Sequence, residues 1–141
     1  MPIVVDASVA VSWCLPDESS DYARQVLLAL RNGETGSVPP LWPVEVVNAL
    51  VVAKRRARMS ENDMDRAMVL LGSMGIRPVH MDLSETLTEV RRLAETNSLT
   101  AYDASYVHLA LREDAALATL DERLRAAARS AGCRVFEPAA P

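Results

Sequence analysis

The chain has 141 residues, of which half are hydrophobic and only 4% are aromatic, and its net charge is −4. This length suits one domain with an aliphatic core. The sequence has neither the roughly 18 uninterrupted apolar residues of a membrane span nor a charged leader before an apolar segment, so we expect a soluble protein without a signal peptide.

Short apolar runs alternate with amphipathic segments along the first half of the chain. Residues 2–5 form an apolar run typical of a buried strand, which ends at Asp6. The apolar face formed by Ala23, Val26 and Leu30 predicts a helix. The elements predicted for this half are a strand at 2–5, a helix at 17–30, a strand at 37–41, a helix from 43 to about 58, and a helix that begins after Ser60 and ends at 71.

The second half continues the same alternation. Its predicted elements are a strand at 76–81, helices at 84–95 and 100–112, a strand at 115–120, a helix at 122–131 and a last strand at 133–136. Residues 1–137 are expected to form one domain, followed by a frayed tail at 138–141. Strands that alternate with helices predict an α/β fold with a mainly parallel sheet. In such a sheet the residues that follow the carboxyl ends of the strands meet at one edge, where functional sites form.

Four carboxylates stand where predicted strands end or predicted helices begin. Asp6 and Asp121 follow strands, whereas Glu45 and Asp103 lie in the first turns of helices. Each also has an ordinary structural explanation. Asp6 and Asp121 suit helix N-caps, Asp103 suits a capping box with Thr100, and Glu45 is favoured by the helix dipole.

Taken together, the four carboxylates would repel one another strongly. At a separation of about 8 Å and an effective dielectric constant near 20, each pair costs roughly 2 kcal/mol, or about 12 kcal/mol for all pairs. Favourable helix ends return at most about 4 kcal/mol, and a domain is stable by only about 5–15 kcal/mol. The cluster must therefore hold protons or cations, and its all-oxygen ligands favour Mg²⁺ or Mn²⁺. Carboxylates with such ions suit phosphodiester hydrolysis, and a pocket of acids would also leave the remaining surface able to bind nucleic acid despite the net charge.

The same four acids lie in stretches that resemble the acidic motifs of PIN-domain ribonucleases, most closely the VapC-type toxins of type II toxin–antitoxin systems. These stretches are VVDASVAVSW, PPLWPVEVVNAL, LTAYDASYVHLAL and LATLDERL. The resemblance covers nearly the whole chain, and the ordered set is specific where each motif alone is weak. It implies a three-layer α/β/α domain that cuts RNA with Mg²⁺ or Mn²⁺ held by Asp6, Glu45, Asp103 and Asp121. It also implies a homodimer, inhibited by an antitoxin protein.

Other polar residues near these motifs are candidates for supporting roles. In the family a Ser or Thr two positions after the first Asp often supports the site, and Ser8 stands there. We expect a similar role for Thr119, and Glu122 is placed to assist or replace Asp121. Asn48 lies one turn beyond Glu45 on the same helix face, where it either orients Glu45, contacts the pocket or is an exposed amide.

The densest group of cations is the basic segment Lys54, Arg55, Arg56 and Arg58, about ten residues beyond Glu45. Cations there stabilise the end of a helix, or they contact RNA backbone roughly 15 Å from the acids. His80 and His108 have no partner at metal-ligand spacing, and we expect structural roles. Cys14 and Cys133 match no ligand spacing either, which predicts free core thiols in a reducing cytoplasm, although a disulfide stays open.

Three other functions compete with the ribonuclease. A phosphorylated receiver domain also gathers acids around Mg²⁺ but needs a lysine near the site, and the single lysine, Lys54, is predicted at the far end of a helix. A phosphatase with an aspartyl nucleophile usually has a second Asp two residues later, where this chain has Ser8. The third alternative is a PIN-like module that binds RNA or a partner without cutting, and only an assay separates it from the enzyme.

Overall fold

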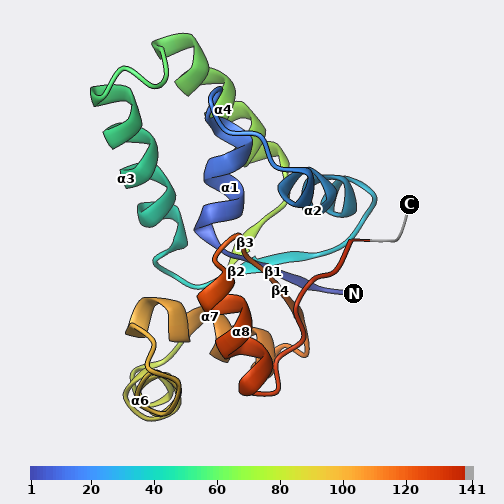
Figure 1. Ribbon diagram of the computed structural model, residues 1–141, viewed down its shortest axis with the longest axis vertical. Helices are drawn as coiled ribbons and strands as arrows, with labels where there is room; N and C mark the ends of the chain where they lie inside the picture. The colour runs from blue at the N-terminus through green and yellow to red at the C-terminus, as the bar shows by residue number, and fades with distance from the viewer. Residues whose placement is uncertain (139–141) are drawn as a thin grey trace.

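The computed structural model describes residues 1–138 and contains a parallel four-stranded sheet (Figure 1). The strand order is β3-β2-β1-β4, so β1 and β2 are the central strands. The strands are β1 Ile3–Val5, β2 Gly36–Val38, β3 Arg77–Pro78 and β4 Ala116–Ala118. All three strand pairs are parallel, which confirms the predicted α/β fold. The predicted tail lies outside the described residues from position 139 onward.

The strands are shorter than the sequence pattern predicts. The prediction of a strand at 37–41 is wrong beyond Val38, because Pro39 and Pro40 have no N–H to donate to a neighbouring strand. The strand predicted at 133–136 is reduced to one isolated parallel bridge, between Leu117 and Val135. The sheet is therefore narrow and short, and most of the chain is helical.

Helices cover both faces of this sheet and give the expected three layers. Figure 1 shows one group of helices above the sheet and another below it. The first group is α1 Ala7–Cys14, α2 Asp21–Arg31, α3 Trp42–Arg55 and α4 Glu61–Ser73. The second group is α5 Leu83–Glu85, the π-helical segment η1 Thr86–Val90, α6 Arg91–Asn97, α7 Ala101–Arg112 and α8 Glu122–Ser130. No helix among residues 1–138 is long and apolar enough to cross a membrane.

Helix α1 is the element that the sequence pattern does not predict. Its residues are almost all apolar, and Val9, Ala10 and Cys14 are buried. Because it packs against α2, α3 and α4 as well as following β1, it has no continuous polar face, so the amphipathic periodicity that reveals surface helices is absent. The predicted helix at 17–30 begins only at Asp21, after the N-cap Ser20.

The core positions the sheet edge at which functional residues are expected. Val5 of β1 is aligned with Ala118 of β4, and both are fully buried. The N–H of Asp6 donates to the carbonyl of Ala118 at 2.9 Å, so the chain segments that follow the two strands remain side by side. Helix α7 packs on both strands from one layer. Cys14 and Cys133 are buried free thiols, as predicted.

Candidate active site

Asp6 lies at the carboxyl end of β1 and is the most buried of the four candidate acids. Only 8% of its surface is exposed. Its Oδ2 accepts hydrogen bonds from the Ser8 hydroxyl at 2.6 Å and from the Thr119 hydroxyl at 2.8 Å. Burial raises the pKa of Asp6, although these two hydroxyls act in the opposite direction.

Ser8 and Thr119 connect Asp6 to the chain segment that carries Asp121. The Ser8 Oγ accepts from the N–H of Leu120 at 3.1 Å, and the Thr119 Oγ1 accepts from the N–H of Asp121 at 3.1 Å. Each hydroxyl therefore accepts from the backbone after β4, which directs its single hydrogen toward Asp6. The predicted supporting residues thus form one hydrogen-bonded bridge between two of the candidate acids.

Asp121 is the N-cap of α8, as its structural explanation predicts. Its Oδ1 accepts from the N–H of Arg123 at 2.9 Å and of Leu124 at 3.3 Å. Asp6 precedes α1 in the same way but makes no side-chain cap hydrogen bond, so the capping explanation is wrong for Asp6. Thr100 caps α7 by accepting from the N–H of Asp103 at 3.1 Å, which places Asp103 in the first turn of that helix.

Glu45 reaches the same region from α3, in the opposite helical layer. Its Oε1 accepts a hydrogen bond from the hydroxyl of Tyr106 at 3.1 Å, and Tyr106 is fully buried on α7. Tyr106 is not among the residues predicted from the sequence, although its position three residues after Asp103 places it on the same helix face. Asn48 is exposed and makes no hydrogen bond to Glu45 within residues 1–138, which agrees with the exposed-amide alternative, and Tyr106 is the residue that orients Glu45.

The four carboxylates influence one another electrostatically. The pKa of Glu45 is raised by burial and by the negative charges of Asp6 and Asp103. The pKa of Asp103 is raised by burial and by the charges of Asp6 and Asp121, while the charge of Arg123 opposes this rise. We call Asp6, Glu45, Asp103 and Asp121 the acid cluster. Within residues 1–138, none of its members forms a salt bridge, so its negative charge is not neutralised by a paired cation.

The donor chemistry of the acid cluster fits a hard divalent cation. Glu45 and Asp121 each use one carboxylate oxygen in the hydrogen bonds above, and within the described chain the other oxygen of each has no hydrogen-bond donor. Such oxygens are the preferred ligands of Mg²⁺ and Mn²⁺. Across residues 1–138, however, no three His, Cys, Asp or Glu side chains converge closely enough to form a closed set of metal ligands. The carboxylates are thus available to a cation without being fully gathered around one.

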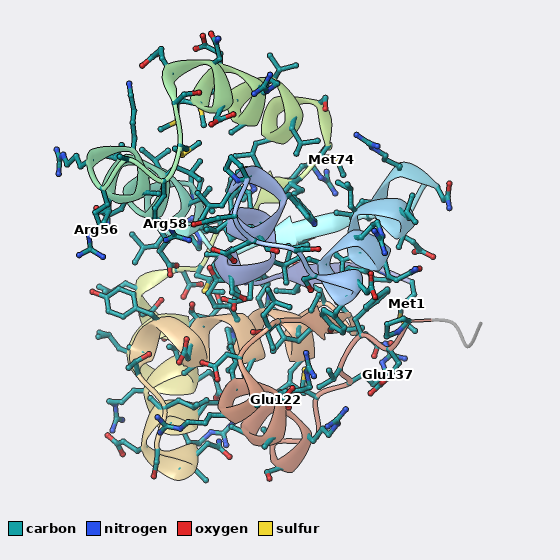
Figure 2. The ribbon with its side chains drawn as sticks, turned by 45° about the horizontal axis from the view of Figure 1, so that its top comes forward. Met1, Arg56, Arg58, Met74, Glu122 and Glu137 are labelled. Carbon is teal, nitrogen blue, oxygen red and sulfur yellow. The ribbon has the colours of Figure 1, made fainter. Side chains whose placement is uncertain are left out.

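The remaining predicted residues lie outside this cluster. Glu122 is exposed and pairs with Arg125 at 2.8 Å. The basic segment is divided, because Lys54 pairs with Glu61, and Arg58 pairs with Asp17 and Glu18. Figure 2 shows Arg56 projecting outward at the end of α3, in the other helical layer from Glu122. Within the described residues, Arg55 and Arg56 are left without salt bridges.

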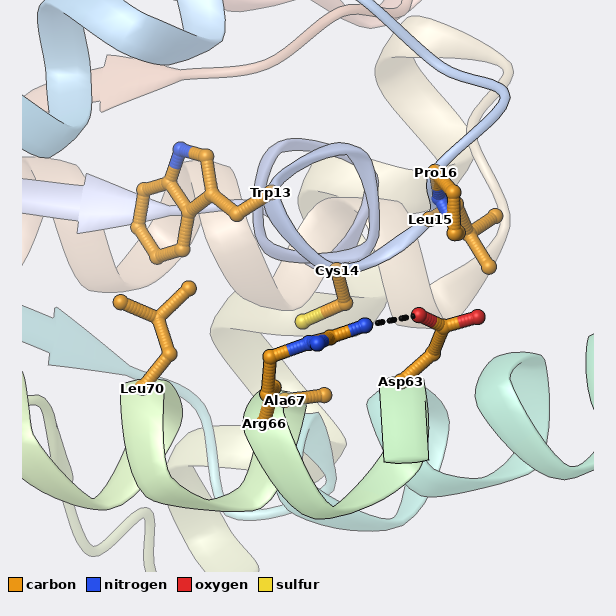
Figure 3. Close-up of a pocket in the computed structure, with 8 residues that line it drawn as sticks. All are labelled: Trp13, Cys14, Leu15, Pro16, Asp63, Arg66, Ala67 and Leu70. Atoms are coloured by element: carbon orange, nitrogen blue, oxygen red, sulfur yellow. Dashed lines mark hydrogen bonds and ion pairs between the residues drawn. The ribbon is translucent and has the colours of Figure 1, made fainter. Parts of the chain in front are cut away.

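A separate hollow lies between α1 and α4 (Figure 3). Trp13, Leu15 and Leu70 contribute to its wall, and Arg66 pairs with Asp63 at its rim at 2.6 Å. None of the acid cluster lines it. The hollow is therefore distinct from the carboxylates and offers no comparable chemistry.

Comparison with known protein sequences identifies related proteins over most of the chain. The family model for the PIN domain matches residues 3–130. Ribonuclease VapC9 of Mycobacterium tuberculosis is 37% identical over 124 residues, which cover 86% of this chain and 87% of the relative. Ribonuclease VapC3 of Pyrobaculum aerophilum is 30% identical over 124 residues, which cover 88% of this chain and 92% of the relative.

Solved structures show the same architecture. PAE2754 from Pyrobaculum aerophilum superposes with a TM-score of 0.68 at 25% sequence identity, over 90% of this chain and 84% of that one. FitAcB from Neisseria gonorrhoeae superposes with a TM-score of 0.64 at 16% identity, over 96% of this chain and 97% of that one. At this lower identity the second likeness shows a shared fold.

Proposed function

Because this chain belongs to the PIN-domain family, we propose that it is a VapC-type endoribonuclease that hydrolyses RNA phosphodiester bonds at the acid cluster. One observation carries the proposal: four carboxylates from four elements lie close enough for their charges to interact, none has a salt bridge within residues 1–138, and the pKa values of Asp6, Glu45 and Asp103 are raised. A stable fold gains nothing from such repulsion. The arrangement is explained if the acids hold a positively charged group during the reaction.

The proposed cofactor is Mg²⁺ or Mn²⁺, held by Asp6, Glu45, Asp103 and Asp121. When bound, such an ion activates water and stabilises the charge that develops on the phosphate and the leaving oxygen. Ser8 and Thr119 orient the Asp6 carboxylate, and Tyr106 orients that of Glu45. Groups that orient ligands in this way typically change metal affinity or activity by about 10–100-fold when they are removed.

The proposed partners are an RNA substrate, a cognate antitoxin and a second copy of the chain, in the cytoplasm. Val44 and Val47 of α3 and Leu83 and Leu87 of the other layer are exposed large apolar side chains in the isolated chain. Groups of exposed apolar residues are typical of protein interfaces. Light scattering at micromolar concentration tests the homodimer, and a monomer at that concentration would contradict it.

The central test is RNA cleavage by the purified protein with Mg²⁺ or Mn²⁺. We expect that EDTA abolishes cleavage and that Asp6→Ala and Asp103→Ala each do so with the metal present. Asp65→Ala is the matched control, because Asp65 is an exposed carboxylate on α4 outside the cluster. Cleavage that persists in EDTA or in both cluster variants would reject the proposed mechanism.

A second candidate function is a PIN-like module that binds RNA or a partner without cutting it. The observation that favours it is the lack of a closed set of metal ligands among residues 1–138. This alternative predicts RNA binding that is unaffected by Mg²⁺ and no cleavage under any metal condition. The ribonuclease predicts cleavage that depends on metal and on the acid cluster.

A further inference from the structure

A small cavity opens beside two members of the acid cluster, between the start of α7 and the start of α8. Its volume is about 180 Å³. We call it the flanking pocket, and its lining is Asn97, Ser98, Leu99, Thr100, Asp103, Asp121, Arg123, Leu124 and Ala127. Because Asp103 and Asp121 form part of its wall, any molecule in the pocket would lie next to the proposed reaction site.

Arg123 is the cation that lines this pocket, close enough to Asp103 for its charge to lower the pKa of that carboxyl. It lies in the first turn of α8, where the positive end of the helix dipole disfavours a cation. Within residues 1–138, Arg123 has no salt bridge, whereas Arg125 pairs with Glu122 and Arg129 pairs with Glu137 on the same helix. Arg123 is therefore available to an anionic ligand.

The opposite wall provides polar groups on an apolar background. The Asn97 Nδ2 donates to the carbonyl of Leu93 at 3.0 Å, which fixes the amide and leaves its Oδ1 as an acceptor. Thr100 accepts from the N–H of Asp103, and its hydroxyl also hydrogen-bonds the Asp103 side chain, whose pKa it lowers. Leu99 and Leu124 add apolar surface. This mixture suits a flat ring that carries hydrogen-bonding edges.

We propose that the flanking pocket binds one nucleotide of the RNA next to the scissile phosphate, with Arg123 contacting a neighbouring phosphate and the wall at 97–100 contacting the base or ribose. The inference rests on the proposed ribonuclease function. A polymer must continue beyond the bond that is cut, and the pocket lies directly beside the acids. Pockets for drug-sized ligands have volumes of about 300–1,000 Å³, so this smaller cavity suits a single base or ribose of the polymer. Contacts to one base would give the enzyme a sequence preference at that position.

Two matched pairs of variants distinguish an effect on the pocket from a general effect on helix α8. Ala127→Leu fills the cavity, whereas Ala126→Leu adds the same bulk at an exposed position of α8. Arg123→Gln removes the pocket cation, whereas Arg129→Gln removes a cation that pairs outside the pocket. Thermal melting of all four variants checks that each is folded.

The first readout is binding, measured by fluorescence anisotropy with a fluorescein-labelled single-stranded RNA of mixed sequence in an Asp6→Asn background. We expect Arg123→Gln to weaken binding by about tenfold. The slope of the logarithm of the binding constant against the logarithm of the salt concentration should also fall by about one in magnitude, as for the loss of one phosphate contact. Arg129→Gln should leave both unchanged. Equal binding by the two variants, or no RNA binding at all, would contradict the proposal that the flanking pocket binds RNA.

The second readout is the sequence at the cut ends of a randomised RNA. Ala127→Leu should remove the base preference at one position next to the cut and raise KM more than it lowers kcat, whereas Ala126→Leu should match the wild type. Cleavage with the same preference and the same KM in both variants would overturn the pocket but leave the ribonuclease intact. If the protein binds RNA through Arg123 but never cuts it, the ribonuclease function is wrong, and with it the placement of this nucleotide next to a scissile phosphate.

Discussion

The two ends of α7 place carboxylates in opposite surroundings. At its beginning, Asp103 faces other carboxylates, and their charges raise its pKa. Toward its end, His108 and Arg112 contact the side chain of Glu85, which belongs to helix α5. The His108 Nε2 and the Arg112 Nη1 lie 2.7 and 2.6 Å from the same Glu85 oxygen, Oε2.

Glu85 has donors on both oxygens. Its Oε1 accepts from the N–H of Asp82 at 3.2 Å, which completes a capping box at the start of α5. Hydrogen bonds from His108 and Arg112 lower the pKa of Glu85 to about 2. The structure thus favours the ionised form of Glu85 and disfavours the ionised form of Asp103. The contacts of Glu85 therefore stabilise the fold, whereas the negative charge of Asp103 is unfavourable for the fold and available to a positively charged ligand.

Replacing the carboxylate with an amide at each end of α7 gives the largest predicted difference in cleavage rate. Asp103→Asn should lower RNA cleavage by about 1,000-fold, because it removes a proposed metal ligand, while the metal-free protein becomes no less stable. Glu85→Gln should change kcat by only a few fold. Initial cleavage rates with Mg²⁺ and thermal melting without it measure both effects. A strongly destabilised Asp103→Asn protein would contradict the claim that this carboxylate is repelled.

Added Mg²⁺ should distinguish the two ends of α7 through stability alone. A ligand at 100 times its Kd stabilises a protein by about 2.7 kcal/mol, which corresponds to about 5–10 °C in Tm for a domain of this size. We expect such a shift in the wild type and in Glu85→Gln, and a much smaller one in Asp103→Asn. Differential scanning calorimetry with and without EDTA measures it. An equal shift in all three proteins would place the cation elsewhere.

The ionic cluster at Glu85 should contribute about 1 kcal/mol to stability, because hydrogen bonds to charged groups are favourable but solvent weakens exposed pairs. Glu85→Gln should therefore lower the midpoint of urea unfolding. Glu89→Gln is the control, since Glu89 is exposed and its salt bridge within residues 1–138 is with Arg92, one turn away. If Glu89→Gln is as destabilising as Glu85→Gln, the contacts of Glu85 with α7 add nothing to the stability of the fold.

The acid cluster could be predicted from the sequence because its positions follow from local rules. Asp6 and Asp121 come directly after apolar strands, and parallel strands bring such positions to one edge of the sheet. Thr100 marks the start of α7, which places Asp103 in the first turn. The bridge through Ser8 and Thr119 follows from the same alignment of β1 with β4.

Contacts between distant helices could not be predicted in this way. Tyr106 meets Glu45 across 61 positions of the chain, and Arg58 meets Asp17 across 41 positions. The sequence shows the basic segment but not the acids that neutralise part of it. Glu85 and His108 meet because the segment 83–97, with its π-helical turn at η1, packs against α7. Helical periodicity identifies the face of a helix, whereas the partner of that face depends on the assembled layers.

The smallest predicted effect is a difference in pH dependence between the two ends of α7. For Asp103, whose folded pKa is raised, the destabilisation by its charge is fully present above that pKa and disappears as pH falls toward the unfolded value of 3.8. For Glu85, whose folded pKa is lowered, the stabilisation is fully present above the unfolded value of 4.5 and is lost only as pH falls toward about 2. Without metal, the difference in Tm between Asp103→Asn and wild type should therefore shrink as the pH falls from 7 toward 3.8, whereas the contribution of the Glu85 carboxylate is lost only below pH 4.5. Melting curves of the three proteins across this range measure both differences, and a Glu85 difference that changes with the Asp103 difference would show that one shared titration governs both ends of the helix.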